Sequence, residues 1–341
     1  MKKYVAALCA LCFVFFLASC SSDKDTRLAV DKDGRTVVER YGQLQIIGTN
    51  LCNEAGEPVQ LRGMSSHGLH WHGKYANRDV LKWLRDDWNT QLWRAALYLT
   101  EGGYITGPVL KFKVIDSVEA AIDLGMYVLI DWHVHRDRDP NVYKAQSLAF
   151  FDEMAQKYGS YPNIIYEICN EPNGDDVTWS GSIKPYAEEV IAVIRKHDPN
   201  NIIIVGTPTW SQDVDKAAED PIIGYDNIMY TLHFYAGSHG EELMAKAERA
   251  MDAGLALFVT EWGTTLDNGD QFHPDKVMPW LSFMRKHNLS WANWSVNNKG
   301  EDSGILKYNK DRNGKGGWVD SDLSPSGLFL RKILKNEIKI K

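Results

Sequence analysis

Eight short apolar runs recur along this chain, and segments with a helical pattern separate them. The runs are rich in β-branched and aromatic residues and are mostly continuous rather than alternating, which is typical of strands buried on both faces. Eight strands interleaved with helices over about 280 residues match the size and order of a single (β/α)8 barrel. The runs lie at residues 59–66, 90–99, 127–134, 164–171, 202–207, 227–235, 255–263 and 289–296.

Residues typical of helix N-termini support the helical segments between the runs. Pro185 lies in the first turn of one segment, and Ser324 followed by Pro325 begins the last one. An open, doubly wound sheet is the competing architecture, but no glycine-rich phosphate turn follows the first run. Ahead of that run, weak alternation after Tyr41 and a turn at residues 53–58 predict an N-terminal β-hairpin.

The N-terminal residues indicate export. Lys2 and Lys3 precede an apolar run that is short for a membrane span, so residues 1–19 are predicted to be a signal peptide. Small residues directly before Cys20 resemble the bacterial lipoprotein processing box. This predicts a lipid on Cys20 and anchoring to a bacterial membrane, with the outer membrane and cell surface as candidates. The alternative is an ordinary cleaved signal with an incidental cysteine.

Two further segments complete the predicted organisation. Residues 20–36 are polar and predict a flexible tether, and residues 37–341 form the predicted catalytic barrel. The formal net charge is −7 without a long basic run, so we expect no nucleic-acid partner. We also expect a monomer. Cys52 and Cys169 are predicted to be free, buried thiols.

Two glutamates lie where predicted strands end. In barrels of this kind the reactive groups gather at the C-terminal ends of the strands. Glu171 and Glu261 end the fourth and seventh runs, which lie across the barrel mouth from one another. A pair of carboxylates facing across a cleft is the equipment for cleaving a glycosidic bond. Other polar or aromatic residues near run ends are Arg94, Tyr98, His133, Asn170, His233, Tyr235 and Trp294.

Other interpretations of these residues remain open at this point. Arg94 could serve a structural ion pair, and His133, His233 and Trp294 could belong to the core. His70 and His72, with His233, suggest a metal-dependent hydrolase of the amidohydrolase type, although a His after the fifth run and an Asp after the eighth are missing. A glycan-binding lipoprotein without catalytic activity would be expected to lack one carboxylate or Arg94.

From about Val37 to its C-terminus the sequence also resembles glycoside hydrolase family 5, and within it the bacterial endo-β-1,4-glucanases (cellulases). The pair Asn170-Glu171-Pro172 and Glu261-Trp262-Gly263, in this order, is the most specific part. The resemblance is carried by residues 59–71, 93–98, 131–133, 166–173, 231–235, 259–263 and 293–301. It implies a retaining, endo-acting hydrolase of β-1,4-glucan (cellulose, carboxymethylcellulose or mixed-linkage glucan) that needs no metal or cofactor. Mannan and xylan are the alternative substrates.

The resemblance and the chemistry of the residues assign roles. Glu261 is the expected nucleophile, and Arg94 and Tyr235 would support its charged form. Glu171 is the expected acid and base, kept protonated at first by the nearby charge of Glu261. Asn170 is expected to hydrogen-bond the sugar 2-hydroxyl. The remaining expected sugar contacts are His133, His233 and Trp294 around the cleaved sugar and, by resemblance, His67, Trp71, Lys299 and Glu301 on the non-reducing side and Trp210 on the leaving side. Tyr98 is a further expected contact without an assigned position.

Overall fold

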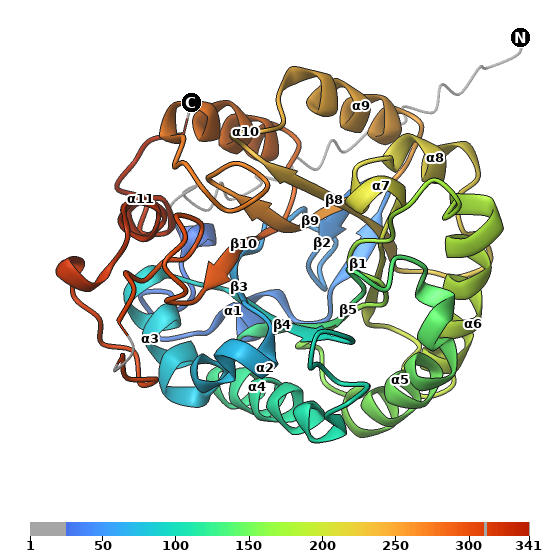
Figure 1. Cartoon of the computed structure of the whole chain (residues 1–341), viewed down its shortest axis with the longest axis horizontal. Coiled ribbons are helices and arrows are strands. Elements are labelled where there is room, and N and C mark those ends of the chain that lie inside the picture. The colour runs from blue at the N-terminus through green and yellow to red at the C-terminus, as the bar shows by residue number, and fades with distance from the viewer. Residues whose placement is uncertain (1–24, 310–311, 341) are drawn as a thin grey trace, which may run out of the picture.

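A closed barrel of eight parallel strands lies inside a ring of helices in the computed structural model, which describes residues 25–309 and 312–340 (Figure 1). The strand order around the barrel is β10-β3-β4-β5-β6-β7-β8-β9. Each predicted run contains one strand, so the predicted single (β/α)8 barrel is confirmed. The strands are β3 (Arg62–Ser66), β4 (Leu92–Tyr98), β5 (Tyr127–His133), β6 (Ile164–Glu167), β7 (Ile202–Val205), β8 (Ile228–Tyr235), β9 (Leu257–Gly263) and β10 (Trp291–Val296).

Helices pack on the outer face of the barrel and connect successive strands. α3 shows how local sequence defines one of them: the Asn77 side chain accepts a hydrogen bond from the Val80 amide at its start, and left-handed Asn89 ends it. Ser324 caps the last helix in the same way, as predicted. The helices around the barrel are α3 (Arg78–Trp88), α4 (Lys111–Leu124), α5 (Lys144–Tyr158), α6 (Lys184–Arg195), α8 (Val214–Glu219), α9 (Glu241–Asp252), α10 (Pro274–Lys286) and α11 (Pro325–Leu334), with the short α2 (Leu69–His72) and α7 (Pro208–Ser211) at the mouth.

Strand β4 shows how the barrel interior is layered. Its outward side chains, such as Trp93, pack into the core between strands and helices, whereas the inward side chains change character along the strand. Leu92 belongs to an apolar cluster at the base, Arg94 forms a buried ionic layer above it, and Tyr98 reaches an aromatic group at the mouth. The apolar base therefore supports a polar layer directly beneath the cleft.

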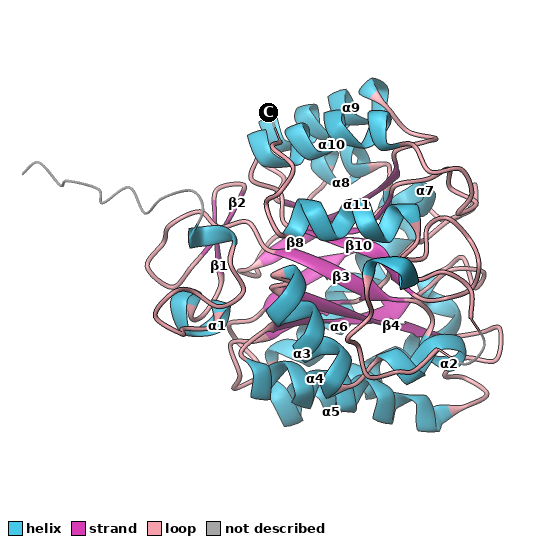
Figure 2. Ribbon diagram, turned by 90° about the vertical axis from the view of Figure 1, so that its left-hand side faces the viewer, coloured by secondary structure: helices cyan, strands magenta, loops and turns pink. Residues whose placement is uncertain are grey.

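An N-terminal hairpin and a short helix close the base of the barrel (Figure 2). Strands β1 (Gln45–Ile47) and β2 (Asn50–Cys52) pair antiparallel and, with α1 (Val37–Tyr41), pack against the apolar base cluster. The predicted hairpin is present, but its turn is at residues 48–49, where Gly48 has a φ of 62°. The segment predicted as that turn, 53–58, forms a second turn.

Most of the predicted tether, residues 25–36, packs against this base. Ala29 is fully buried, and the side chains of Tyr41 and Gln91 donate hydrogen bonds to the carbonyl oxygen of Thr26 at 2.7 and 3.0 Å. These donors come from distant segments, so the polar composition of residues 25–36 did not reveal the packing. Any flexible tether therefore ends before Asp25. The predicted signal peptide and Cys20 lie outside the described residues.

No helix within 25–309 or 312–340 is long and apolar enough to cross a bilayer. Cys52 and Cys169 are free and buried, in agreement with the sequence prediction.

Candidate active site

A cleft of about 410 Å³ opens at the C-terminal ends of the strands. Twelve of the fourteen predicted catalytic and sugar-binding residues line it. The other two, Arg94 and Asn170, are fully buried and contact the lining residues from below. The twelve are His67, Trp71, Tyr98, His133, Glu171, Trp210, His233, Tyr235, Glu261, Trp294, Lys299 and Glu301.

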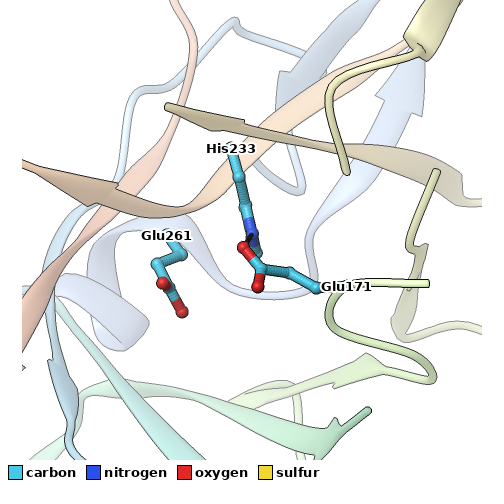
Figure 3. A group of neighbouring side chains, drawn as sticks. All are labelled: Glu171, His233 and Glu261. Atoms are coloured by element: carbon cyan, nitrogen blue, oxygen red, sulfur yellow. Dashed lines mark hydrogen bonds and ion pairs between the residues drawn. The ribbon is translucent and has the colours of Figure 1, made fainter. Parts of the chain in front are cut away.

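Glu171 and Glu261 face one another within this cleft (Figure 3). Glu171 follows β6, and Glu261 lies on β9. One carboxylate oxygen of each lies within 4.8 Å of the other, and the side chain of His233 from β8 lies within the same distance of both. The two glutamates are only 8% and 4% exposed, so each is held in a nearly dry environment that strengthens its electrostatic interactions.

Both carboxylate oxygens of Glu261 accept hydrogen bonds. Arg94 donates from Nη1 to Oε2 at 2.9 Å, and Tyr235 donates from its hydroxyl to Oε1 at 2.7 Å. Two donors from different strands fix the orientation of the carboxylate and balance its negative charge. This arrangement suits a group that must attack while ionised.

Glu171 has a different environment. Burial raises its pKa well above the ordinary value, the negative charge of Glu261 raises it further, and Arg94 opposes both effects. Its Oε1 atom lies 2.9 Å from Nδ1 of His233. The environment of Glu171 thus favours its protonated form, whereas two hydrogen-bond donors hold the neighbouring carboxylate of Glu261. An acid beside an oriented nucleophile is arranged in this way.

A layer of buried charge lies beneath the two glutamates. Arg94 donates to both oxygens of Glu167, at 2.7 and 3.1 Å, and its Nη2 atom lies 3.0 Å from Oδ2 of Asp131. Burial raises the pKa of Glu167 to about 7 and that of Asp131 to about 8, while Arg94 lowers both. One guanidinium therefore contacts three carboxyl groups, since it also holds Glu261.

This layer was missed by the sequence analysis. Asp131 and Glu167 are charged residues within otherwise apolar, buried strands. Buried charges require partners, so their presence in these runs was a signal that Arg94 serves more than Glu261.

A β-bulge in β9 places two consecutive side chains inside the barrel. Thr231 on β8 pairs with Phe258 on β9, and His233 pairs with Glu261. The pairing therefore advances by two residues along β8 but by three along β9. The register with β10 shifts at the same place. A bulge leaves one residue extra and redirects side chains. As a result, Thr260 and Glu261 both contact interior groups, Thr260 at Glu167 and Glu261 at Arg94.

Aromatic rings form the wall above Glu261. His133 stacks on Tyr98 with ring centroids 4.1 Å apart and lies nearly parallel to Trp294 at 5.4 Å. Asn170 accepts from Arg94 at 2.5 Å and donates to the Val134 carbonyl at 3.0 Å. Its contact with a sugar hydroxyl stays a prediction.

The two ends of the cleft carry exposed tryptophans. Trp71 on α2 is 48% exposed, and Trp210 on α7 is 46% exposed. Because α2 follows β3 and α7 follows β7, which lies four strands further around the barrel, the two rings flank the mouth from opposite sides. Beside Trp71, Lys299 pairs with Glu301 at 2.6 Å. Trp210 also borders a second hollow of about 760 Å³.

Comparison with known proteins identifies the family. The cellulase family model (glycosyl hydrolase family 5) matches residues 32–300, which is most of the chain. This chain belongs to glycosyl hydrolase family 5. Endoglucanase A of Evansella cellulosilytica is 54% identical over 306 residues, which cover 89% of this chain and 62% of that protein. Endoglucanase 5 of Pectobacterium carotovorum subsp. carotovorum is 50% identical, covering 88% and 59%. The chain thus spans about three fifths of each relative.

Solved structures of similar proteins share the fold. A structure from Cytophaga hutchinsonii is similar with a TM-score of 0.85 and 46% identity, covering 89% of this chain and 97% of that one. The catalytic domain of a Thermobifida fusca endoglucanase, solved in complex with cellotetraose, has a TM-score of 0.83 at 36% identity, covering 87% and 99%.

The amidohydrolase interpretation does not fit this family 5 site. Among the described residues, the one group of His, Cys, Asp or Glu close enough to share a metal ion is Glu171, His233 and Glu261. His70 and His72 are not part of it. Both oxygens of Glu261 and both ring nitrogens of His233 already have protein hydrogen-bond partners.

The electrostatic coupling of this family 5 pair gives a direct prediction. Glu261→Gln removes a negative charge beside Glu171, so the pKa of Glu171 should fall relative to the wild type. In the wild type it should lie above the ordinary glutamate value of about 4.3. A pH titration of the side-chain carboxyl carbon by NMR measures both. Glu301→Gln, at the edge of the cleft, is the control and should leave the pKa of Glu171 unchanged. An equal response to both substitutions would contradict the coupling.

Proposed function

We propose that this family 5 hydrolase is an endo-β-1,4-glucanase that acts with net retention of configuration. The observation that carries the proposal is the short separation of Glu171 and Glu261, with oxygens within 4.8 Å. Retaining enzymes hold their carboxyl groups about 5–5.5 Å apart, whereas inverting enzymes leave about 6.5–9.5 Å for a water molecule. The name endoglucanase on relatives of 50–54% identity supports the substrate class.

The geometry supplies both half-reactions. Glu261, oriented by Arg94 and Tyr235, attacks the anomeric carbon while Glu171 gives its proton to the departing glycosidic oxygen. The bond to the leaving sugar breaks, and a covalent ester to Glu261 forms. The charge of Glu261 is then gone, so Glu171 becomes more acidic and can take a proton from an attacking water molecule. Attack by that water releases Glu261 and restores the original configuration.

The open shape of the cleft supports internal cleavage of a long chain. Exposed rings at both ends, Trp71 and Trp210, provide apolar faces on which sugar rings stack, so a polysaccharide can extend past the catalytic pair in both directions. Because both carboxylates and Arg94 are assembled, the site lacks the defect expected of a barrel that only binds glycan.

A substrate and product assay tests this function. Carboxymethylcellulose and mixed-linkage glucan should lose viscosity much faster than they gain reducing ends, and NMR should show the β-anomer as the first product. Xylan and mannan are the comparison substrates. Faster cleavage of either would assign the chain to that activity instead. Initial α-anomer would contradict retention.

We further propose export and lipid attachment at Cys20. The charged start, the apolar run and the small residues before Cys20 support this proposal. Stable anchoring requires more than one acyl chain, which a diacylglyceryl-modified cysteine provides.

Cys20→Ser should therefore release the enzyme from the membrane fraction while its turnover on a soluble glucan stays unchanged. The matched control is Cys52→Ser, which alters a buried thiol at the barrel base and should leave the enzyme with the membranes. Fractionation followed by activity measurement tests both variants. Mass spectrometry that found an unmodified Cys20 in the wild-type protein would contradict lipid attachment.

A further inference from the structure

A continuous chain of hydrogen bonds runs from Glu171 down into the barrel. Oε1 of Glu171 lies 2.9 Å from Nδ1 of His233, and Nε2 of the same ring lies 2.8 Å from the Thr260 hydroxyl. Thr260 in turn donates to Oε1 of Glu167 at 2.7 Å. All four side chains are almost completely buried. The chain thus connects the acid of the proposed reaction to a carboxyl group that the reaction does not use.

The donors at its lower end define the direction of this chain. A guanidinium only donates, and Arg94 donates to both oxygens of Glu167, so both of these oxygens act as acceptors. The Thr260 hydroxyl donates its single hydrogen to Glu167, so the hydroxyl oxygen accepts a hydrogen bond from Nε2 of His233. The ring hydrogen of His233 is then on Nε2, and Nδ1 presents a lone pair to Glu171.

A neutral His233 ring carries one N–H hydrogen, on either Nδ1 or Nε2. Burial lowers its pKa well below the ordinary value, and the charge of Arg94 lowers it further, which favours the neutral ring. In a neutral imidazole one nitrogen donates and the other accepts, and the partner of one nitrogen decides the state of the other. A hydrogen bond between Nδ1 and Glu171 therefore requires that Glu171 carry the proton.

We propose that Thr260 and Glu167 are positioning residues that fix the hydrogen of His233 on Nε2 and thereby favour the protonated form of Glu171. This inference rests on the proposed role of Glu171 as acid and base. When substrate binds, the glycosidic oxygen competes with Nδ1 for the proton of Glu171. After transfer, the Glu171 carboxylate faces the same lone pair, which makes it a stronger base toward water. The fixed ring thus raises the proton affinity of Glu171 in both half-reactions.

Other charged and titratable groups also face this chain. Arg94 and Tyr98 come from β4, Asp131 and His133 from β5, Tyr235 from β8 and Glu261 from β9. A substitution of Thr260 leaves all of them in place. A change in titration on removal of its hydroxyl is then attributable to the hydrogen-bond chain.

Thr260→Val and Thr260→Ser form the matched pair of variants. Valine has the shape of threonine without the hydroxyl, so His233 can move its hydrogen to Nδ1 and donate to the carboxylate of Glu171. The basic limb of kcat/KM on a glucan oligosaccharide should move down by about one pH unit, and kcat/KM on that limb should fall about tenfold. Thr260→Ser keeps the hydroxyl and should restore the wild-type profile. An aryl cellobioside with a dinitrophenolate leaving group needs no acid, so its kcat/KM should be the same in all three proteins.

Two outcomes would overturn the proposal. One is a basic limb that stays in place in a folded Thr260→Val protein, or moves equally far in Thr260→Ser. The other concerns the tautomer of His233 in the wild-type protein, which ¹⁵N NMR of histidine-labelled protein measures. The signals of His233 are assigned from those lost in His233→Asn, and they should show a protonated Nε2 and an unprotonated Nδ1. The opposite tautomer contradicts the proposal even if Thr260→Val does not fold. A wild type that cleaves no glucan would instead refute the proposed function, while the NMR result still decides the tautomer.

Discussion

Glu261→Ala should lose nearly all hydrolytic activity, and added azide should restore turnover with an inverted product. Loss of a covalent nucleophile commonly costs about 10⁴–10⁶ in kcat. The alanine leaves a space beside the anomeric carbon that a small anion can enter, while Glu171 remains in place to assist departure of the leaving group. The product should be the α-glycosyl azide. An activated aryl cellobioside as substrate, with ¹H NMR of the products, measures both rate and configuration.

Glu171→Ala is the matched comparison. It keeps Glu261 and its two hydrogen-bond donors, so the covalent intermediate still forms and any azide product keeps the β configuration. Formation of the α-glycosyl azide by Glu171→Ala, instead of by Glu261→Ala, would exchange the two roles. Inverted product from neither variant would argue against a covalent intermediate.

Arg94→Met should lose both stability and activity. The variant leaves Asp131, Glu167 and Glu261 buried without their shared cation, and removal of one partner of a buried ion pair costs about 3–5 kcal/mol. Activity should fall about 10²–10⁴-fold, because Glu261 and Asn170 each lose a charge-assisted hydrogen bond. Urea unfolding and kcat/KM on a soluble glucan measure the two effects.

The loss of stability should also depend on pH. Arg94 lowers the pKa of Glu167, about 7, and of Asp131, about 8, so both pKa values of the folded protein rise further without it. An acid whose pKa is raised by folding stabilises the fold at low pH and loses that contribution as pH rises through the folded value. Above about pH 8 the wild type approaches its plateau while the variant continues to lose stability. The difference in unfolding free energy should therefore widen from pH 6 to pH 9.

Arg94→Lys separates charge from geometry. It restores a cation but not the fork that contacts three carboxyl groups at once. We expect the pH-dependent part of the destabilisation to shrink while activity stays low. A constant difference between Arg94→Met and the wild type across pH 6–9 would contradict the shared-cation interpretation.

The barrel and the residues at its mouth could be predicted because their signals are local. Each strand is one continuous apolar run, and the polar residue at its end faces the cleft as a consequence of the fold. Glu171, His133 and Trp294 were accessible in this way. That rule could not predict the buried layer of Asp131 and Glu167 beneath the cleft. It considers only the residues at strand ends and not which side chains within a strand point inward.

Thr260 shows why other parts of the site could not be predicted from the sequence. Regular alternation would place Thr260 and Glu261 on opposite faces of β9, and the bulge that turns both inward depends on pairing with β8 and β10. Such a register shift is a tertiary property. The packing of residues 25–36 is a similar case, since its hydrogen-bond donors, such as Gln91, are far away in sequence.

The attachment of residues 25–36 to the barrel base has a consequence for orientation. The base, formed by α1, β1 and β2, lies at the opposite end of the barrel from α2 and α7 (Figure 2), whose residues Trp71 and Trp210 line the cleft. In the lipid-anchored form that we propose, the chain from Cys20 to Asp25 can extend no further than about 18 Å, since an extended residue spans about 3.3–3.6 Å. The base would then rest near the lipid headgroups, and the cleft would point away from them. Polysaccharide arriving from outside the cell could be cut without entering the narrow space between protein and bilayer.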